Sequence, residues 1–427
     1  MKWKTSLGIA ALALASLLFN GCGTQQAAQE DNGVVEIKYW YAWQDQIAEN
    51  NKELTQKFND TIGKEKGIHI TAEYQGSYDD LQAKLQSAFA AHEEPAVSVI
   101  EISSIKAFAK NGMLNPLDEY FSKEDINDFY PGLLKNSYVD DKFYGVPYLR
   151  STPILYYNKT LFKKAGLDPE KGPENWTELK AMSQKLAAIG VNGFGFISDP
   201  WPLEALISQN GGSMLSDDET KAVFNSPAGI GMLEYLRDGI QNSNFKYYNG
   251  AGGSDNCESA FMNQQLAMRI TSTADLTKNL KLAKENGYEI GTCFIPMQTK
   301  RSVPTGGCNL VMTSALDAKH KAAAAEFIKF MTAPEQAIYS HIKTGYLPSR
   351  QSITNDDKIK EMYAKIPQYR TALQQLPYAF GRPMNEAYHE ASKIYSNMFD
   401  KILTTSIDIK TALDEAAAKD NALLSNK

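Results

Sequence analysis

Short strand-like and helix-like patterns follow one another along the first hundred residues. Apolar and polar residues alternate in the strand-like segments, and apolar residues return every three or four positions in the helix-like ones. The predicted order is a strand over 34–40, a helix with Ile47, Leu54 and Phe58 on one face, a strand over 68–74, a helix over 81–90 and a strand over 97–102. Strands that alternate with helices are typical of an α/β fold built on a parallel sheet.

Later helices are predicted from the signals at their starts. Ser226 stands directly before Pro227, as a capping hydroxyl stands before proline in the first helical position. The segment from Thr332 to Glu335 fits a capping box, and Thr177 is predicted to cap another helix. The stretch beyond residue 384 is predicted to be largely helical.

The start of the chain has the features of an export signal. Two lysines precede a short apolar run over 7–19, which is too short to span a bilayer comfortably. A small residue stands directly before Cys22, which resembles the bacterial lipobox, although Phe19 replaces the usual leucine. We predict a lipoprotein signal over 1–22, lipidation of the Cys22 thiol and a flexible tether over 23–33. A plain secretory signal is the alternative.

Composition limits the class of protein. The chain has 427 residues, 43% of them hydrophobic and 22% charged, which is enough for two hydrophobic cores. The net charge of −6 lacks the basic excess that a nucleic-acid binder needs. Cys257, Cys293 and Cys308 show no CxxC spacing and are predicted to be core residues. Neither a metal site nor a cofactor is indicated.

Motifs of common enzymes are missing from the sequence. His389 and Glu390 begin like a zinc-binding HExxH motif, but position 393 is lysine. Neither a GxSxG nucleophile elbow nor a GxxxxGK[ST] phosphate loop occurs. A pair of carboxylates could still serve a glycosidase, so a hydrolase stays open as an alternative, but we predict that the chain is not an enzyme.

Several blocks of sequence match one known family. They are 74–78 (YQGSY), 145–169 (GVPYLRSTPILYYNKTLFKKAGLDP), 176–179 (WTEL), 306–307 (GG) and 344–348 (TGYLP). With these blocks the chain resembles the extracellular solute-binding proteins of carbohydrate ABC importers, and within them the branch that binds glycerol 3-phosphate. The resemblance extends from about residue 34 to about residue 402.

The resemblance implies an α/β fold of the periplasmic-binding-protein type. It has two lobes, a hinge that the chain crosses several times and a ligand cleft between the lobes. Lobe one would comprise 34–151 with 308–346, and lobe two 152–307 with 347–427. The implied partners are an ABC permease and its ATPase, and the implied state is a monomer anchored by lipid at the extracytoplasmic face of the cell membrane.

The resemblance also implies a set of ligand contacts. The residues for the phosphate group are Tyr78, Ser151, Ser272, Gly307, Tyr346 and Arg382. Arginine suits phosphate because its planar fork can donate two hydrogen bonds. Glu101 would accept hydrogen bonds from glycerol hydroxyls, unless Ile100 or Ile102 faces the cleft instead, and Trp201 would cover the carbon backbone. Arg150 departs from the family pattern and could supply a second phosphate fork.

We therefore expect a binding protein for glycerol 3-phosphate or for a glycerophosphodiester such as glycerophosphocholine. A binding protein for a neutral sugar or oligosaccharide is the alternative in the same class, with aromatic residues as stacking faces. A surface-anchored glycan or phosphodiester hydrolase and an adhesive lipoprotein are the alternatives from other classes.

Overall fold

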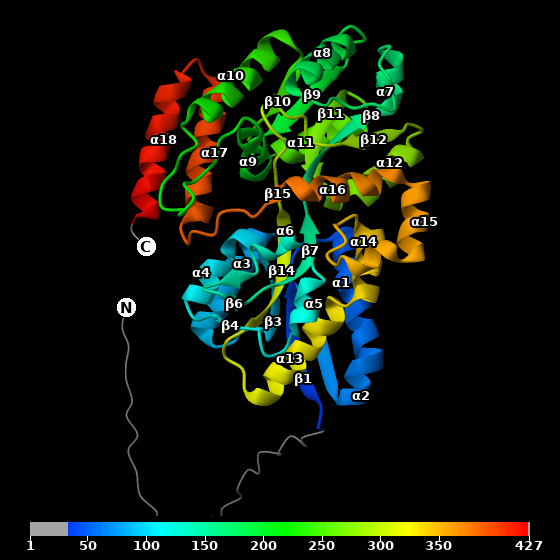
Figure 1. Cartoon of the computed structure of the whole chain (residues 1–427), viewed down its shortest axis with the longest axis vertical. Helices are drawn as coiled ribbons and strands as arrows, with labels where there is room; N and C mark the ends of the chain where they lie inside the picture. The colour runs from blue at the N-terminus through cyan, green and yellow to red at the C-terminus, as the bar shows by residue number, and fades with distance from the viewer. Residues whose placement is uncertain (1–32, 251, 426–427) are drawn as a thin grey trace, which may run out of the picture. The chain divides into compact units, whose positions relative to one another are not determined.

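The computed structural model describes residues 33–250 and 252–425, and Figure 1 shows two β-sheets with helices packed around them. The predicted signal segment and Cys22 lie outside the described residues. None of the described helices is long and apolar enough to cross a membrane.

The first sheet has the strand order β2-β1-β3-β14-β4, and β7 pairs with β14. Its strands are β1 (Val35–Tyr41), β2 (Ile68–Tyr74), β3 (Val97–Glu101), β4 (Leu114–Asn115), β7 (Val146–Ser151) and β14 (Gly306–Thr313). The strand β1 runs parallel to β2 and β3, as the sequence predicts. The sheet is nevertheless mixed, because β14 is antiparallel to β3, β4 and β7.

The second sheet has the strand order β10-β9-β11-β8-β12. Its strands are β8 (Pro153–Asn158), β9 (Asn192–Ile197), β10 (Phe245–Tyr248), β11 (Leu266–Ser272) and β12 (Ile290–Cys293). It is also mixed, because β8 is antiparallel to both of its neighbours. Short pairs are formed by β5 (Tyr138–Val139) with β6 (Lys142–Phe143), and by β13 (Val303–Pro304) with β15 (Ala379–Phe380).

Helices cover both sheets. The longer ones are α1 (Asp45–Phe58), α3 (Tyr78–Ala91), α8 (Trp176–Ala187), α9 (Pro200–Gln209), α10 (Pro227–Asn242), α11 (Gly253–Met262), α12 (Leu276–Glu285), α13 (Ala318–Met331), α14 (Pro334–Thr344), α17 (Tyr388–Thr404) and α18 (Ile409–Leu424). The shorter ones are α2 (Lys64–Lys66), α4 (Ile105–Lys110), α5 (Lys123–Asn127), α6 (Pro131–Leu134), α7 (Lys159–Lys164), α15 (Asp357–Lys365) and α16 (Arg370–Gln375). The helices α17 and α18 confirm the helical C-terminal stretch.

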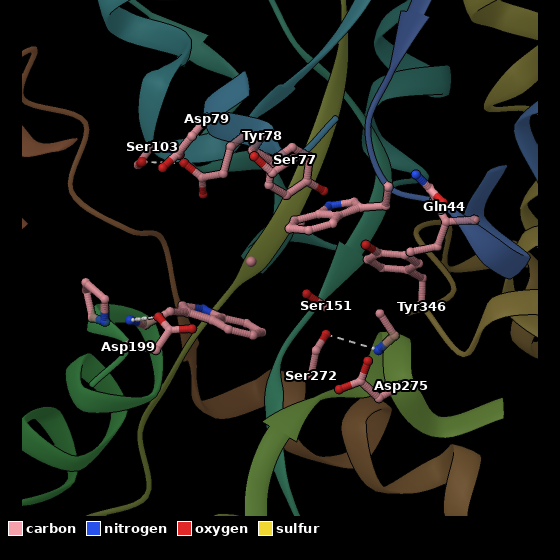
Figure 2. A pocket seen from close by; sticks show the side chains of 18 of the residues that line it. Gln44, Ser77, Tyr78, Asp79, Ser103, Ser151, Asp199, Ser272, Asp275 and Tyr346 are labelled. Atoms are coloured by element: carbon pink, nitrogen blue, oxygen red, sulfur yellow. Dashed lines mark hydrogen bonds between the residues drawn. The ribbon is translucent and has the colours of Figure 1, made fainter. Parts of the chain in front are cut away.

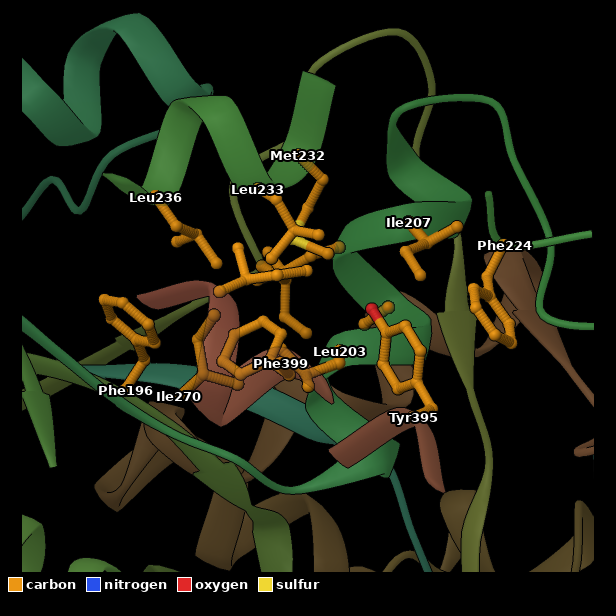
Figure 3. Close-up of a cluster of buried hydrophobic side chains, with 14 of the residues drawn as sticks. Phe196, Leu203, Ile207, Phe224, Met232, Leu233, Leu236, Ile270, Tyr395 and Phe399 are labelled. Carbon is orange, nitrogen blue, oxygen red and sulfur yellow. The ribbon is translucent and has the colours of Figure 1, made fainter. Parts of the chain in front are cut away.

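Each sheet packs into its own hydrophobic core, and a third cluster also lies against strands of the second sheet. In β1 the buried residues Val35, Ile37, Tyr39 and Tyr41 alternate with more exposed ones, so one face of the strand packs inward. The core of the second sheet is completed by helices α9, α10 and α17, whose side chains interdigitate in Figure 3. The separate cores agree with the two-lobed fold class, and the residue bounds predicted for the lobes stay a prediction.

The connections between the sheets are short and close together. Thr152 alone separates β7 of the first sheet from β8 of the second. Thr305 alone separates β14 of the first sheet from β13, which pairs with β15 in the short two-stranded sheet. A third connection follows α14, where the N–H of Leu347 donates to the carbonyl of Arg150 at 2.7 Å. These crossings bring residues from distant parts of the sequence to one place.

The predicted helix starts have mixed outcomes. Ser226 caps α10 by accepting a hydrogen bond from the N–H of Gly229, as predicted. The prediction for Thr177 is wrong, because the N-cap of α8 is Asn175, two residues earlier, and its side chain accepts from the N–H of Glu178. Asparagine is the better N-cap of the two, so its preference outweighs that of the threonine two residues later.

The capping box predicted from Thr332 to Glu335 is also wrong. The hydroxyl of Thr332 donates to the carbonyl of Ile328 in the preceding helix α13. Ala333 therefore occupies the N-cap position of α14 without a side-chain hydrogen bond. The Thr332 hydroxyl is therefore hydrogen-bonded to the end of α13 and does not cap α14.

Candidate ligand-binding site

A pocket of about 1020 Å³ collects residues from both sheets. Figure 2 shows Tyr78 and Ser77 on one side, Ser272 and Asp275 on the other, and Ser151 between them. The predicted site residues that line it are Tyr78, Glu101, Ser151, Trp201, Ser272, Gly307, Tyr346 and Arg382. Their contacts with a ligand stay a prediction.

Tyr78 is placed by the cap of helix α3. The hydroxyl of Ser77 accepts from the N–H of Asp80, and the Asp80 carboxylate accepts from the N–H of Ser77 in return. This capping box fixes the first turn, in which the Tyr78 ring meets Trp43 edge to face at 5.2 Å between ring centroids. The Tyr78 hydroxyl has no hydrogen-bond partner within the described part of the chain. Burial raises the pKa of this phenol, so it stays protonated and can donate to a ligand.

Tyr346 lies just after the end of helix α14 and is buried. Its carbonyl contacts Nδ1 of His341, whose Nε2 lies 3.1 Å from the hydroxyl of Tyr363. Burial lowers the pKa of His341 to about 4, so the imidazole is neutral near pH 7. A neutral ring donates from one nitrogen and accepts at the other, which fits Nδ1–H toward Tyr346 and Nε2 toward Tyr363.

Two glycines shape the pocket wall where β14 passes β7. Gly307 has φ of +87°, and a Cβ added to it would lie 2.0 Å from the carbonyl oxygen of Leu149. A Cβ on Gly306 would lie 2.4 Å from the indole of Trp201. Gly307 therefore requires glycine, and a side chain at Gly306 would displace the Trp201 indole. The backbone at Gly307 is shielded by no side chain of its own.

Trp201 is in the first turn of helix α9. The Asp199 carboxylate caps this helix by accepting from the N–H of Trp201 at 2.9 Å. The indole Nε1 donates to the carbonyl of Thr305 at 3.0 Å, so the ring is held against the crossing between the sheets. Burial raises the pKa of Asp199, which also lines the pocket.

Arg382 lies between two carboxylates. Its Nη1 donates to Glu101 at 3.0 Å, and its Nη2 donates to Glu204 at 2.8 Å. Its Nε lies 3.2 Å from each oxygen of Glu204, whose Oε1 also accepts from the hydroxyl of Tyr388 at 2.6 Å. Burial disfavours the charge of Arg382, but the two carboxylates outweigh it and raise the pKa further above its usual value. In this state a ligand meets an arginine whose charge is already matched.

Glu101 faces the pocket from the end of strand β3, whereas Ile100 and Ile102 are fully buried. Its carboxylate also accepts from the N–H of Ser103 at 3.0 Å and from the Ser103 hydroxyl. These bonds fix its direction, and one oxygen bonds to Arg382.

Arg150 is not among the residues that line the pocket. Its side chain is fully buried, and its guanidinium donates to carbonyl, amide and hydroxyl oxygens of the protein. The interpretation of Arg150 as a second fork in contact with phosphate is therefore corrected.

Several lining residues escaped the sequence analysis or were weighed for other roles. Acidic residues outnumber basic ones in the lining. The acidic ones are Asp45, Glu49, Asp79, Glu101, Asp199, Asp275 and Glu285, and the basic ones besides His389 are Lys278, Lys281, Arg382 and Lys393. Asp275 follows Ser272, which caps a short 3-10 turn by accepting from the N–H of Ala274 at 3.1 Å. The Ser272 hydroxyl at the end of a predicted strand indicated a site residue in the sequence, but no local pattern indicated Asp275.

The pocket has hydrogen-bonding groups and aromatic faces but no arrangement of metal ligands. Among residues 33–250 and 252–425, no three His, Cys, Asp or Glu side chains gather closely enough to hold a metal ion. Such a pocket can bind a small polar molecule through hydroxyls, carboxylates and ring faces.

Comparisons with known proteins point to one family. The family model described as bacterial extracellular solute-binding protein matches residues 53–368. The sn-glycerol-3-phosphate-binding periplasmic protein of Escherichia coli (strain K12) is 28% identical over 435 residues, with 96% of each chain covered. The protein of the same name from Pectobacterium atrosepticum is 27% identical over 413 residues, with 91% of each chain covered.

Two solved structures are similar throughout. UgpB from Mycobacterium tuberculosis, in complex with glycerophosphocholine, gives a TM-score of 0.81 at 24% identity and covers 92% of this chain and 98% of its own. The cyclic α-maltosyl-1,6-maltose binding protein of Arthrobacter globiformis gives a TM-score of 0.80 at 24% identity and covers 92% of this chain and 100% of its own. These similarities confirm the predicted two-lobed α/β fold.

Proposed function

We propose, from the premise that this chain belongs to the bacterial extracellular solute-binding proteins, that its pocket captures glycerol 3-phosphate or a glycerophosphodiester. Members of this family deliver solutes to ABC importers and are not enzymes, which confirms the predicted class of function. The finer assignment of the ligand is our proposal.

The observation that carries the proposal is the set of groups at the pocket. Hydroxyls of Tyr78, Ser151 and Ser272, the backbone at Gly307 and the guanidinium of Arg382 all reach its lining. Hydroxyl, amide and guanidinium donors together suit a phosphate group, whose oxygens only accept hydrogen bonds. The full-length similarity to glycerol-3-phosphate-binding relatives supports the same choice.

The size of the pocket favours a glycerophosphodiester over the smaller monoester. Its volume of about 1020 Å³ is at the upper end of the usual range for small-molecule sites, far more than a glycerol phosphate fills. Trp43, Tyr78 and Trp201 also line it. Aromatic faces attract quaternary ammonium groups, so glycerophosphocholine is the diester that we would test first.

A neutral oligosaccharide is the second candidate, and the state of Arg382 favours it. Glu101 and Glu204 already match the charge of this arginine, which lowers its attraction for an anion. Aromatic rings and carboxylates are also groups that can stack on and hydrogen-bond to sugar rings. The similar structure from Arthrobacter globiformis is that of a protein named for binding a cyclic maltosyl-maltose.

Thermal unfolding against a small panel separates the candidates. The panel is glycerol 3-phosphate, glycerophosphocholine, inorganic phosphate, maltose and trehalose. A ligand at a hundred times its Kd stabilises the folded protein by about 2.7 kcal/mol, which raises the midpoint measurably. We expect shifts with the glycerophosphates and none with the sugars. Shifts with the sugars alone would contradict the proposed ligand and leave the role in import intact.

We also propose that the protein is a monomer anchored to the extracytoplasmic face of the membrane by a lipid on Cys22. The small residue before this cysteine and the preceding apolar run support the lipid anchor. Labelling of the expressed protein with radioactive palmitate should mark the wild type and not Cys22→Ala. Equal labelling of both would contradict the anchor, and light scattering of the delipidated protein tests the monomer.

A further inference from the structure

The charges that line the pocket are unfavourable for an anionic ligand. Its lining has more acidic than basic residues, and Arg382 is paired with Glu101 and Glu204. A phosphate entering this lining would meet net negative charge. A positive charge outside the lining would change that balance.

Arg150 supplies such a charge. Its Nε donates to the carbonyl of Gly306 at 2.9 Å, and its Nη2 donates to the hydroxyl of Thr305 at 3.0 Å. Its Nη1 donates to the carbonyl of Leu133 at 2.6 Å and to the amide oxygen of Asn309 at 3.1 Å. All four acceptors are neutral, so the hydrogen bonds are satisfied while the charge is not cancelled.

Arg150 forms no ion pair with any described residue. The arginines that do form them are Arg269, Arg350 and Arg382. Burial lowers the pKa of Arg150 to about 10, which still leaves it charged near pH 7. The result is a buried positive charge that forms no ion pair with a described residue, although the Glu101 carboxylate acts on it from beyond contact distance.

This charge lies directly behind the wall of the pocket. Ser151, the next residue, lines the pocket, as do Gly306, whose carbonyl Arg150 binds, and Gly307, its partner across the β7–β14 pairing. Neither glycine has a side chain to widen the separation. Charges act strongly through a protein interior because little water screens them there.

We infer that Arg150 is a specificity-determining residue that acts through the pocket wall and favours an anionic group beside Ser151 and Gly307 without touching it. The inference rests on the proposed function, since a neutral ligand would gain nothing from the charge. It explains how a pocket with an acidic lining can hold a phosphate.

A pair of substitutions at Asn309 tests the charge and leaves Arg150 in place. Asn309 is fully buried, and its side-chain nitrogen lies 3.1 Å from the carbonyl of Asn136. Asn309→Ser and Asn309→Asp both remove this amide donor, but Asn309→Asp alone puts a carboxylate beside Arg150. Arg150→Gln, which removes the charge itself, completes the set.

Calorimetric titration of the full protein with glycerophosphocholine and glycerol 3-phosphate gives the readout, at low and at high salt. We expect Asn309→Asp and Arg150→Gln to raise the Kd of both by about tenfold relative to Asn309→Ser, or about 1.4 kcal/mol. The ratio should persist at high salt, because the charge is buried. Thermal unfolding of the ligand-free variants shows which of them are folded. If Arg150→Gln does not fold, the comparison of Asn309→Asp with Asn309→Ser tests the inference by itself.

The outcomes separate the two proposals. Equal Kd values for Asn309→Asp and Asn309→Ser would overturn the inference and assign Arg150 a purely structural role. If the wild-type protein binds sugars but neither glycerophosphocholine nor glycerol 3-phosphate, the proposed function is overturned, and the inference with it.

Discussion

Glu204 holds Arg382 from the buried side of the pocket wall, through Nε and Nη2. Its own side chain is almost fully buried and does not line the pocket. Glu101 takes the remaining edge of the guanidinium at 3.0 Å. The direction of Arg382 is therefore set by one carboxylate that lines the pocket, Glu101, and by one that does not, Glu204.

Removal of Glu204 should destabilise the fold. Glu204→Ala leaves the hydroxyl of Tyr388 without its acceptor and Arg382 with Glu101 alone. Loss of one partner from a buried ion pair costs about 3–5 kcal/mol. Urea unfolding of the ligand-free protein measures this, with Glu234→Ala on the exposed face of α10 as control, expected within about 0.5 kcal/mol. Equal midpoints for the two variants would show that the Glu204 pair contributes nothing.

Removal of Arg382 should weaken phosphate binding selectively. Arg382→Ala takes away the guanidinium and leaves Glu101 and Glu204 as uncompensated carboxylates that repel an anion. Charge-assisted hydrogen bonds are worth about 1.5–3 kcal/mol, so we expect a rise in Kd of about tenfold to a hundredfold for glycerophosphocholine. Arg301→Ala is the matched control, because Arg301 stacks on Phe294 outside the lining. The same loss for a bound neutral sugar would contradict a phosphate role for Arg382.

The close approach at Gly307 predicts a large cost for any side chain there. Gly307→Ala adds a methyl group 2.0 Å from the carbonyl oxygen of Leu149, at φ of +87°. Gly190 has a similar φ of +77° but nothing within 4 Å of the added carbon. Gly190→Ala should therefore cost about 1–2 kcal/mol from backbone strain alone. Gly307→Ala should cost clearly more in urea unfolding, and equal losses would contradict the steric argument.

Asp420 predicts a dependence of stability on pH. It is buried on α18, and burial raises its pKa to about 7. Between the unfolded value of about 4 and this folded value, the folded state holds the extra proton. Stability should therefore fall as pH rises through this window, by up to about 1.4 kcal/mol per pH unit.

Asp420→Asn removes that titration. The variant and the wild type should be similarly stable near the acid end of the window, and the variant should be the more stable one above pH of about 7. Asp217→Asn, at an exposed position, is the control. Parallel curves of unfolding free energy against pH for Asp420→Asn and the wild type would contradict the raised pKa of Asp420.

The sequence predicted the fold best where burial alternates simply. Strand β2 has the predicted bounds, because Ile68 and Ile70 are buried and His69 and Thr71 are exposed. Helix starts were less certain, because several capping residues stood close together. Thr332 shows the reason, because its hydroxyl donates a hydrogen bond within the preceding helix. No local sequence pattern predicts this hydrogen bond.

The site was predictable as far as motifs reach. Tyr78 and Tyr346 lie in sequence blocks that match the family, and both line the pocket. Arg150 lies in such a block too, but its burial depends on acceptors from Leu133 and Thr305, which only the fold brings together. Glu204 carried no signal, because its role depends entirely on where Arg382 lies.

The packing of Trp201 against Gly306 has a practical consequence for spectroscopy. Trp43 and Trp201 line the pocket, whereas Trp40 and Trp176 do not. The emission of an indole shifts with the polarity around it, so a solute that displaces water from the pocket alters the light from two of these four rings. The Trp201 indole is also held by its hydrogen bond to Thr305, so its signal reports on the crossing between the sheets. The unlabelled protein thus carries its own optical reporter of occupancy.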